Sequence, residues 1–303
     1  MNPIVNGRPQ PLGRSALYAV LDQYLAALKG RDPSRVRWSA RVYNTENNVA
    51  LMVGDGLWGT ITGLGTYDLR FCDEAGRQVG WFGTVDETDE NSAIALRLKV
   101  DAEGAIAEVE TLVVRQADSG LKFEPQRFET KPPLIELVEP ARRSPRERLV
   151  SIAHGYFDTL QLNDGTLFVR FHPDCQRVEN GVQTTNNPEF ARVVPVAALG
   201  CEAQLRLGNY HYDDRLRARR YELVDEERGL VFAAAFIDHC GRLADYRLTD
   251  GRVVTSHIRR PHSFYLLELF KIEDGMIRQI EANFITVPYN MPSPWDGWHD
   301  RIA

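Results

Sequence analysis

Two histidine–aspartate pairs are the residues of this 303-residue chain whose types and spacing best suit proton transfer. His172 and Asp174 lie two residues apart, and Asp238 directly precedes His239. Histidine has a reference pKa of about 6.5, so it exchanges protons near neutral pH, and a neighbouring carboxylate can hold its tautomer. We therefore predict catalytic acid or base roles for the two histidines and orienting roles for the two aspartates.

Further polar and aromatic residues predict a substrate-binding surface beside these pairs. Neighbours on a strand point to opposite faces, so only one of Asp238 and His239 can face a given cavity. Tyrosine side chains that face the same cavity could donate a hydrogen bond to a developing oxyanion. The predicted binding residues are Glu179, Asn180, Tyr210, Tyr212, His257 and Trp58.

The same residues also have structural interpretations. A histidine before proline, such as His172, is commonly a strand-end or surface residue. Glu179 and Asn180 follow a short strand, where they could fix a turn through backbone hydrogen bonds, and for this pair we favour the structural interpretation. The segment around Tyr210 and Tyr212 could be a solvated edge strand, and that around His257 an exposed loop.

The elements that would position these residues occur twice in the chain, as an internal repeat. An apolar helical stripe in residues 15–28 recurs in residues 149–160, and residues 36–49 align with residues 169–182. LKVDAEGAIAEVE, which ends at Glu110, aligns with FKIEDGMIRQIE, which ends at Glu281, and each copy predicts a hairpin. The first copy has Ser39 and Arg41 where the second has His172 and Asp174, so the second copy is the better enzyme candidate.

Proline and capping signals divide the chain into parts. Residues 123–143 are proline-rich and predict a linker, and Ser144-Pro145-Arg146-Glu147 predicts a capping box that starts the second helix. Each copy then predicts one curved antiparallel sheet closed by a helix, which is an α+β fold. The predicted parts are cones at residues 14–122 and 144–287 and a C-terminal tail or lid at residues 288–303.

This pattern resembles the nuclear transport factor 2-like, or SnoaL-like, superfamily, in an uncharacterised tandem subgroup. The resemblance rests on Tyr24-Leu25 and Tyr156-Phe157 near the helix ends, the Glu-Asn after a short strand, the G-x-I-x-x-x-E hairpin and the closing PYNMPSPW. It implies two cone-shaped sheets, each closed by N-terminal helices around a deep, mostly apolar cavity. The superfamily contains enzymes that act on ring compounds and members that only bind, so the resemblance implies no single reaction.

The composition of the chain limits the kinds of partner and cofactor that we expect. A net charge of −6 without a long basic run disfavours nucleic acid. The chain lacks both a leader pattern and a long uncharged apolar run, so we expect a soluble, cytoplasmic protein without a membrane partner. Four scattered cysteines fit buried thiols, and the histidine spacings do not suggest a metal site, so we predict neither a metal nor another cofactor.

Taken together, these features predict a cofactor-independent acid/base enzyme that works in the second cone. The expected reaction is that of a lyase, dehydratase or isomerase, including aldol-type cleavage that releases a small aldehyde. The expected substrate is a hydrophobic, ring-bearing, hydroxylated small molecule. The alternative is a non-catalytic module that binds a small molecule or a protein. We expect the two copies to form an internal pseudo-dimer, or the chain to form a homo-oligomer.

Overall fold

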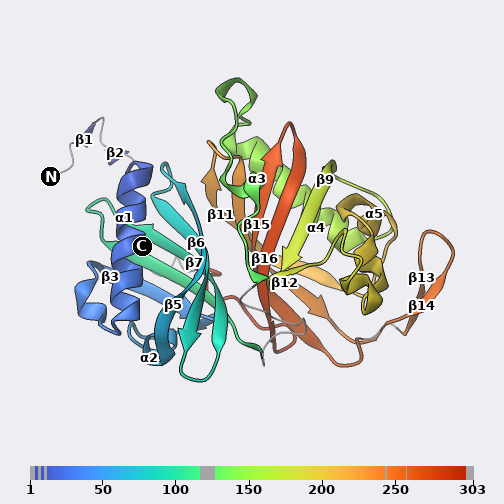
Figure 1. Cartoon of the computed structure of the whole chain (residues 1–303), viewed down its shortest axis with the longest axis horizontal. Coiled ribbons are helices and arrows are strands. Elements are labelled where there is room, and N and C mark those ends of the chain that lie inside the picture. The colour runs from blue at the N-terminus through green and yellow to red at the C-terminus, as the bar shows by residue number, and fades with distance from the viewer. Residues whose placement is uncertain are drawn as a thin grey trace.

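The structure is a computed structural model that describes residues 4–5, 8–9, 12–116, 127–242, 244–256 and 258–297. It has an α+β architecture with two six-stranded sheets (Figure 1). The elements of the first half are β1 (Ile4–Val5), β2 (Arg8–Pro9), α1 (Arg14–Lys29), η1 (Pro33–Arg35), β3 (Trp38–Glu46), β4 (Val49–Ala50), α2 (Leu57–Thr60), β5 (Ile61–Asp73), β6 (Gln78–Glu87), β7 (Asn91–Val100) and β8 (Ile106–Val114).

The second half repeats this series with insertions. Its elements are α3 (Pro132–Ile135), η4 (Pro140–Arg142), α4 (Arg146–Leu162), β9 (Arg170–Glu179), β10 (Val182–Gln183), η5 (Phe190–Arg192), η6 (Pro195–Ala198), α5 (Cys201–Arg206), β11 (Arg215–Asp225), β12 (Leu230–His239), β13 (Asp245–Arg247), β14 (Val253–Thr255), β15 (His262–Glu273) and β16 (Met276–Val287).

The two sheets share one topology, which confirms the internal repeat. The strand orders are β4-β3-β8-β7-β6-β5 and β10-β9-β16-β15-β12-β11. In each sheet the first long strand pairs in parallel with the last one, and the other neighbours run antiparallel. The predicted hairpins are β7–β8 and β15–β16, and the second turns through Asp274 and Gly275, both at positive φ.

Each sheet is covered on one face by the helix that precedes it. The apolar stripe of α1 packs on the first sheet, and that of α4 packs on the second. Helix α4 begins at Arg146 with Pro145 at the N-cap position and without a side-chain cap. The predicted capping box is therefore wrong, because Ser144 lies one residue too early to cap the helix.

The other faces of the two sheets pack against each other. Their shared core contains large side chains from both copies, among them Phe71 and Phe82 of the first and Phe232 and Tyr265 of the second. Figure 1 shows the strands of both sheets between the outer helices. This packing joins the two copies into one body within the chain. The formation of a homo-oligomer stays a prediction.

The segments on either side of the second copy contact residues of the first copy. From the predicted linker, Leu134 is buried in the core between the sheets. From the predicted tail, the carbonyl of Pro294 accepts a hydrogen bond of 2.8 Å from the Tyr43 hydroxyl, and the carbonyl of Pro292 accepts one of 2.9 Å from Asn48. The described part of the tail therefore links the second copy to the first by hydrogen bonds.

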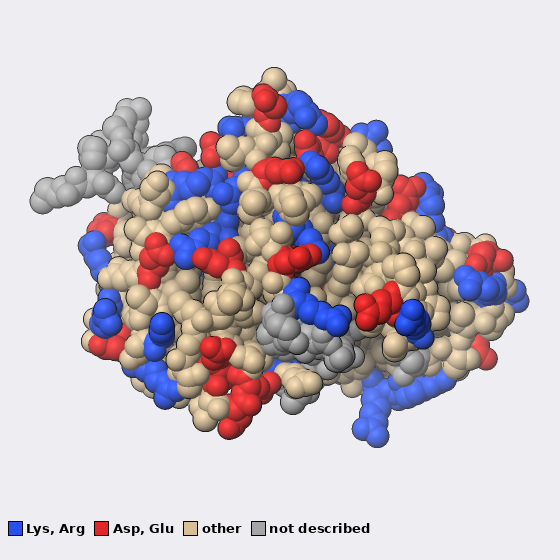
Figure 2. Space-filling view, in the orientation of Figure 1, with Lys and Arg blue, Asp and Glu red and all other residues tan. Residues whose placement is uncertain are grey.

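The surface is charged without a dominant sign on the face shown in Figure 2, where basic and acidic side chains are interspersed. Among the described residues, none of the helices has the length and apolar character needed to span a membrane.

Candidate functional site

The first predicted pair, His172 and Asp174, lies at the surface of β9. The imidazole Nδ1 is 3.7 Å from the Asp174 carboxylate, but the Asp174 side chain is 88% exposed and that of His172 is 32% exposed. The pairing of β9 with β16 jumps from Phe171 to Gln176, so the intervening residues bulge out of the ladder. This position agrees with the surface interpretation of His172, and the catalytic roles of the pair stay predictions.

The second predicted pair is split between the two faces of the sheet. Asp238 faces the core between the sheets, where it accepts hydrogen bonds from Arg217 (2.9 Å), Arg215 (3.1 Å) and Ser263 (2.6 Å). Burial alone would raise the pKa of Asp238, but these bonds outweigh it and lower the pKa. Asp238 is thus an ionised structural anchor, and its predicted orienting role for His239 does not fit this arrangement.

His239 faces the helix-covered side of the second sheet. Its Nδ1 is 3.1 Å from the carboxylate of Asp213, and both side chains are buried. Burial would lower the pKa of His239, but the contact with Asp213 outweighs it and raises the pKa. Rings of Tyr212, His262 and Phe264 surround the imidazole at centroid distances of 5.8, 4.7 and 4.9 Å. The acid or base role of His239 stays a prediction.

The Glu-Asn motif is built into the turn between two strands in each copy. Asn180 has a positive φ, donates a hydrogen bond of 3.0 Å to the carbonyl of Phe284 and accepts one of 2.9 Å from the Phe284 amide. Asn47 makes the same two contacts with Val113 of the first copy, at 3.2 and 2.8 Å. The two amides therefore continue the parallel strand pairing, which agrees with the structural interpretation of Asn180.

An arginine that the sequence analysis did not select organises the interior of the second cone. Arg177 lies on β9 and is buried, and its guanidinium is 3.2 Å from Glu179 and 2.7 Å from the amide oxygen of Gln204. It also donates to the hydroxyl of Tyr210, which in turn donates to Gln204 at 2.5 Å. Glu179 and Tyr210 from the predicted binding set are thus brought together, whereas Tyr212 lies nearer His239.

A second carboxyl group, Glu268 on β15, shares this interior. Glu268 is 4% exposed and lies between Leu266 and Phe270, which belong to the core under α4. Burial, assisted by the charge of Glu179 and opposed by Arg177, raises the pKa of Glu268 to about 8. The cone therefore contains a carboxyl group with a raised pKa near Glu179, which is ion-paired with Arg177.

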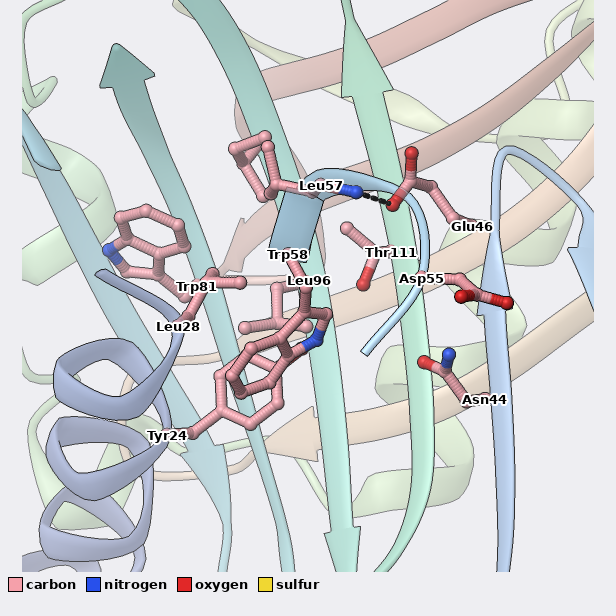
Figure 3. A pocket seen from close by; sticks show the side chains of 11 residues that line it. Tyr24, Leu28, Asn44, Glu46, Asp55, Leu57, Trp58, Trp81, Leu96 and Thr111 are labelled. Atoms are coloured by element: carbon pink, nitrogen blue, oxygen red, sulfur yellow. Dashed lines mark hydrogen bonds between the residues drawn. The ribbon is translucent and has the colours of Figure 1, made fainter. Parts of the chain in front are cut away.

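The first cone has its own pocket, lined by aromatic side chains on one side and polar ones on the other (Figure 3). The lining residues are Tyr24, Leu28, Asn44, Glu46, Asp55, Leu57, Trp58, Trp81, Ile94, Leu96 and Thr111. Glu46 accepts a hydrogen bond of 2.7 Å from the Leu57 amide, and burial raises the pKa of Glu46. The pocket contains about 330 Å³ of empty space, part of it open to solvent, and has room for about one water molecule.

The remaining predicted binding residues are divided between the two cones. We call Arg177, Glu179, Gln204, Tyr210 and Glu268 the second-cone cluster. Trp58 lines the first-cone pocket, so it lies apart from this cluster. Tyr212 lines a smaller hollow of about 170 Å³ with Asp214, Cys240 and Arg242. His257 lies outside the described residues. Among the described residues, no group of three or more histidine, cysteine and carboxylate side chains is arranged to hold a metal ion.

Comparisons with known proteins match one family to the second half of the chain. Residues 142–284 match a domain of unknown function, DUF8021. No curated protein matches the chain. One solved structure that it resembles is AclR from Streptomyces galilaeus, named only provisionally as a hydroxylase, with 13% sequence identity and a TM-score of 0.31. The match covers 48% of this chain and 83% of AclR.

The DUF8021 segment contains every residue of the second-cone cluster. These include Arg177 and Glu268, which the sequence analysis missed. A sequence signal existed for both. Glu268 is the lone charged residue within the apolar run FYLLELF, and Arg177 stands two residues before the repeated Glu-Asn where the first copy has Asn44. A charged residue on a buried strand is uncommon unless it is paired, so both positions could have been selected.

Proposed function

We propose that the chain is a cofactor-independent acid/base enzyme whose reaction takes place in the second cone, and that each cone has the nuclear transport factor 2-like fold. The observation that carries the proposal is a pair of neighbouring carboxyl groups in different surroundings, one ion-paired and the other with a pKa raised by burial. Arg177 forms an ion pair of 3.2 Å with Glu179, while burial raises the pKa of Glu268 to about 8. Two such groups can give and take a proton in one reaction.

In this proposal Glu268 is the general acid and Glu179 the general base. Glu179 takes a proton from a carbon or hydroxyl of the substrate, and Glu268 protonates the leaving oxygen or the new carbon–hydrogen position. The Tyr210 hydroxyl turns from Gln204, to which it donates in the structure, and donates its hydrogen bond to the developing oxyanion. The nearby rings of Tyr156 and Phe270, 5.0 Å apart, favour a ring-bearing substrate, and the class of reaction is that of a lyase, dehydratase or isomerase.

The test is a product screen with hydroxylated aromatic, terpenoid and steroid compounds, without added cofactor, followed by mass spectrometry. A loss of water, a loss of a small aldehyde or an isobaric shift is expected with the wild-type protein. Glu268→Gln should lower turnover by about 10²- to 10⁴-fold, because one proton transfer contributes about that much.

The matched control for this screen is Glu189→Gln, which makes the same chemical change at an exposed position of the second cone. It should leave turnover unchanged. Turnover by Glu268→Gln at the wild-type rate would reject the assignment of Glu268, and a full screen without any product would reject the enzyme.

A second candidate function, binding without catalysis, is favoured by the first-cone pocket. Two carboxyl groups, Glu46 and Asp55, face three aromatic rings, and the lining contains no basic residue. Arg115 lies 3.7 Å from Glu46 outside the lining and forms a closer ion pair of 2.7 Å with Glu87. Carboxylates beside aromatic faces attract cations, and the water-sized free space fits a primary ammonium group better than a larger one.

This candidate predicts that methylammonium binds and that methanol, its neutral analogue, binds at least about tenfold more weakly. Quenching of tryptophan fluorescence measures both, since Trp58 and Trp81 line the pocket. Glu46→Gln should remove the preference for the amine, whereas the exposed Glu103→Gln should keep it. Equal affinity for the amine and the alcohol in the wild-type protein would contradict a cation site.

A further inference from the structure

Two thiols in the second cone lie closer together than unbonded sulfur atoms ordinarily do. The Sγ atom of Cys175, on β9, is 2.8 Å from the Sγ atom of Cys201, the first residue of α5. Both residues are free thiols in the structure and both are buried. A disulfide bond joins sulfur atoms about 2.05 Å apart, so only a small further approach separates this contact from a bond. We propose that Cys175 and Cys201 form a disulfide that ties β9 to α5.

The surroundings of the pair divide the two thiols into an attacking and a resolving one. The hydrogen bond to Cys201, together with burial, raises the pKa of Cys175 well above its ordinary value. Burial would also raise the pKa of Cys201, but the hydrogen bond from Cys175 and the charge of Arg177 outweigh it and lower the pKa. Cys201 is therefore the better nucleophile, because the thiolate is the reactive form.

The reaction is a thiol–disulfide exchange with a small-molecule disulfide such as oxidised glutathione. The Cys201 thiolate attacks one sulfur of the oxidant, which breaks the oxidant's bond and releases the first reduced thiol. Cys175 then loses its proton, attacks Cys201 and releases the second reduced thiol. The two cysteines are oxidised by two electrons in total, and the oxidant becomes two thiols.

The bond would close the irregular segment between β10 and α5. Residues 184–200 contain only the short turns η5 and η6, and Cys175 and Cys201 lie on the elements at either side of it. Arg177 follows Cys175 by two residues, Gln204 follows Cys201 by three, and these two side chains contact each other at 2.7 Å. The disulfide would thus fix the backbone that holds this arginine, whether or not the cone is catalytic.

Tryptic mapping of the wild-type protein tests the proposal without a change of sequence. Cleavage at Arg170, Arg177, Arg192 and Arg206 gives FHPDCQR with Cys175 and VVPVAALGCEAQLR with Cys201. After incubation with oxidised glutathione and alkylation of the remaining thiols, the two peptides should be found joined and should separate on reduction. The intact protein should lose two hydrogen atoms, and its free thiols should fall from four to two.

Variants of the other two cysteines serve as matched controls. Cys72→Ser and Cys240→Ser should leave the joined peptide unchanged, whereas Cys201→Ser should abolish it and leave Cys175 open to alkylation. Two unlinked, fully alkylated peptides after oxidation would overturn the proposal. A stable glutathione adduct on Cys201, or a bridge from either cysteine to Cys72 or Cys240, would overturn it as well.

Discussion

Replacing Glu110 with alanine is expected to lower the free energy of unfolding by about 3 to 5 kcal/mol. Glu110 lies on β8 in the core between the sheets, and its side chain is 1% exposed. It accepts hydrogen bonds from Arg97 (3.0 Å) and Tyr265 (2.6 Å), and it also pairs with Arg220 of the second copy. Removal of the carboxylate leaves two buried guanidinium groups with less compensating charge, which is the costly way to break a buried ion pair.

The ionisation of Glu110 supports this expectation. Burial acts to raise the pKa of Glu110, but the charges of Arg220 and Arg97 outweigh it and lower the pKa to about 2. The residue is therefore charged throughout the range in which the protein would be handled, and the loss should be similar at pH 6 and pH 8. Urea unfolding followed by tryptophan fluorescence measures it.

Two further substitutions make this result interpretable. Glu103→Gln changes an exposed carboxylate on the loop between β7 and β8 and should shift the free energy of unfolding by less than about 0.5 kcal/mol. Glu110→Gln keeps an acceptor for Tyr265 and should fall between the wild-type protein and Glu110→Ala. A loss below 1 kcal/mol for Glu110→Ala would contradict the view that this cluster joins the two copies.

The internal repeat could be predicted from the sequence because it depends on patterns among residues that are near one another in the chain. The helix stripes, the two hairpins and the Asn47 and Asn180 turns each depend on residues that are near one another in the chain. Even the bulge is repeated, since the pairing of β3 skips from Trp38 to Tyr43 just as that of β9 skips from Phe171 to Gln176.

The candidate site was predicted less well, because its contacts join distant parts of the chain. Alternation along β9 cannot be counted across the bulge, so the sequence did not reveal that His172 faces outward. The final glutamates of the two hairpins, Glu110 and Glu281, each meet a tyrosine of the other copy, Tyr265 and Tyr67 respectively. These partners depend on how the two sheets pack, and that packing has no local pattern.

The second large effect concerns Glu268, whose burial should make the stability of the wild-type protein fall as the pH rises. The pKa of Glu268 is about 8 in the folded protein, against an ordinary value of 4.5. Between these two values the unfolded chain releases the proton while the folded protein keeps it, so the contribution present below pH 4.5 is lost as the pH rises towards 8. A difference of about 3.5 in pKa corresponds to roughly 5 kcal/mol.

Glu268→Gln should remove this dependence because its amide does not titrate. The variant should match the wild-type protein near pH 4.5 and exceed its free energy of unfolding by several kcal/mol at pH 8, as measured by urea unfolding at a series of pH values. Glu281, whose pKa burial raises to about 7, should contribute a smaller part of the decline in both proteins. Glu189→Gln should keep the full wild-type slope.

Taken together with turnover, this measurement separates a catalytic Glu268 from one without a catalytic role. Burial alone predicts the gain in stability at pH 8, so a Glu268 without a catalytic role should give a variant that gains stability and keeps its turnover. A group that the fold tolerates for the sake of proton transfer should give a variant that gains stability at pH 8 while it loses turnover, as expected when a site costs stability. Parallel slopes for Glu268→Gln and the wild-type protein would show that Glu268 is not held protonated, and the acid of the proposed reaction would have to be sought elsewhere in the cone.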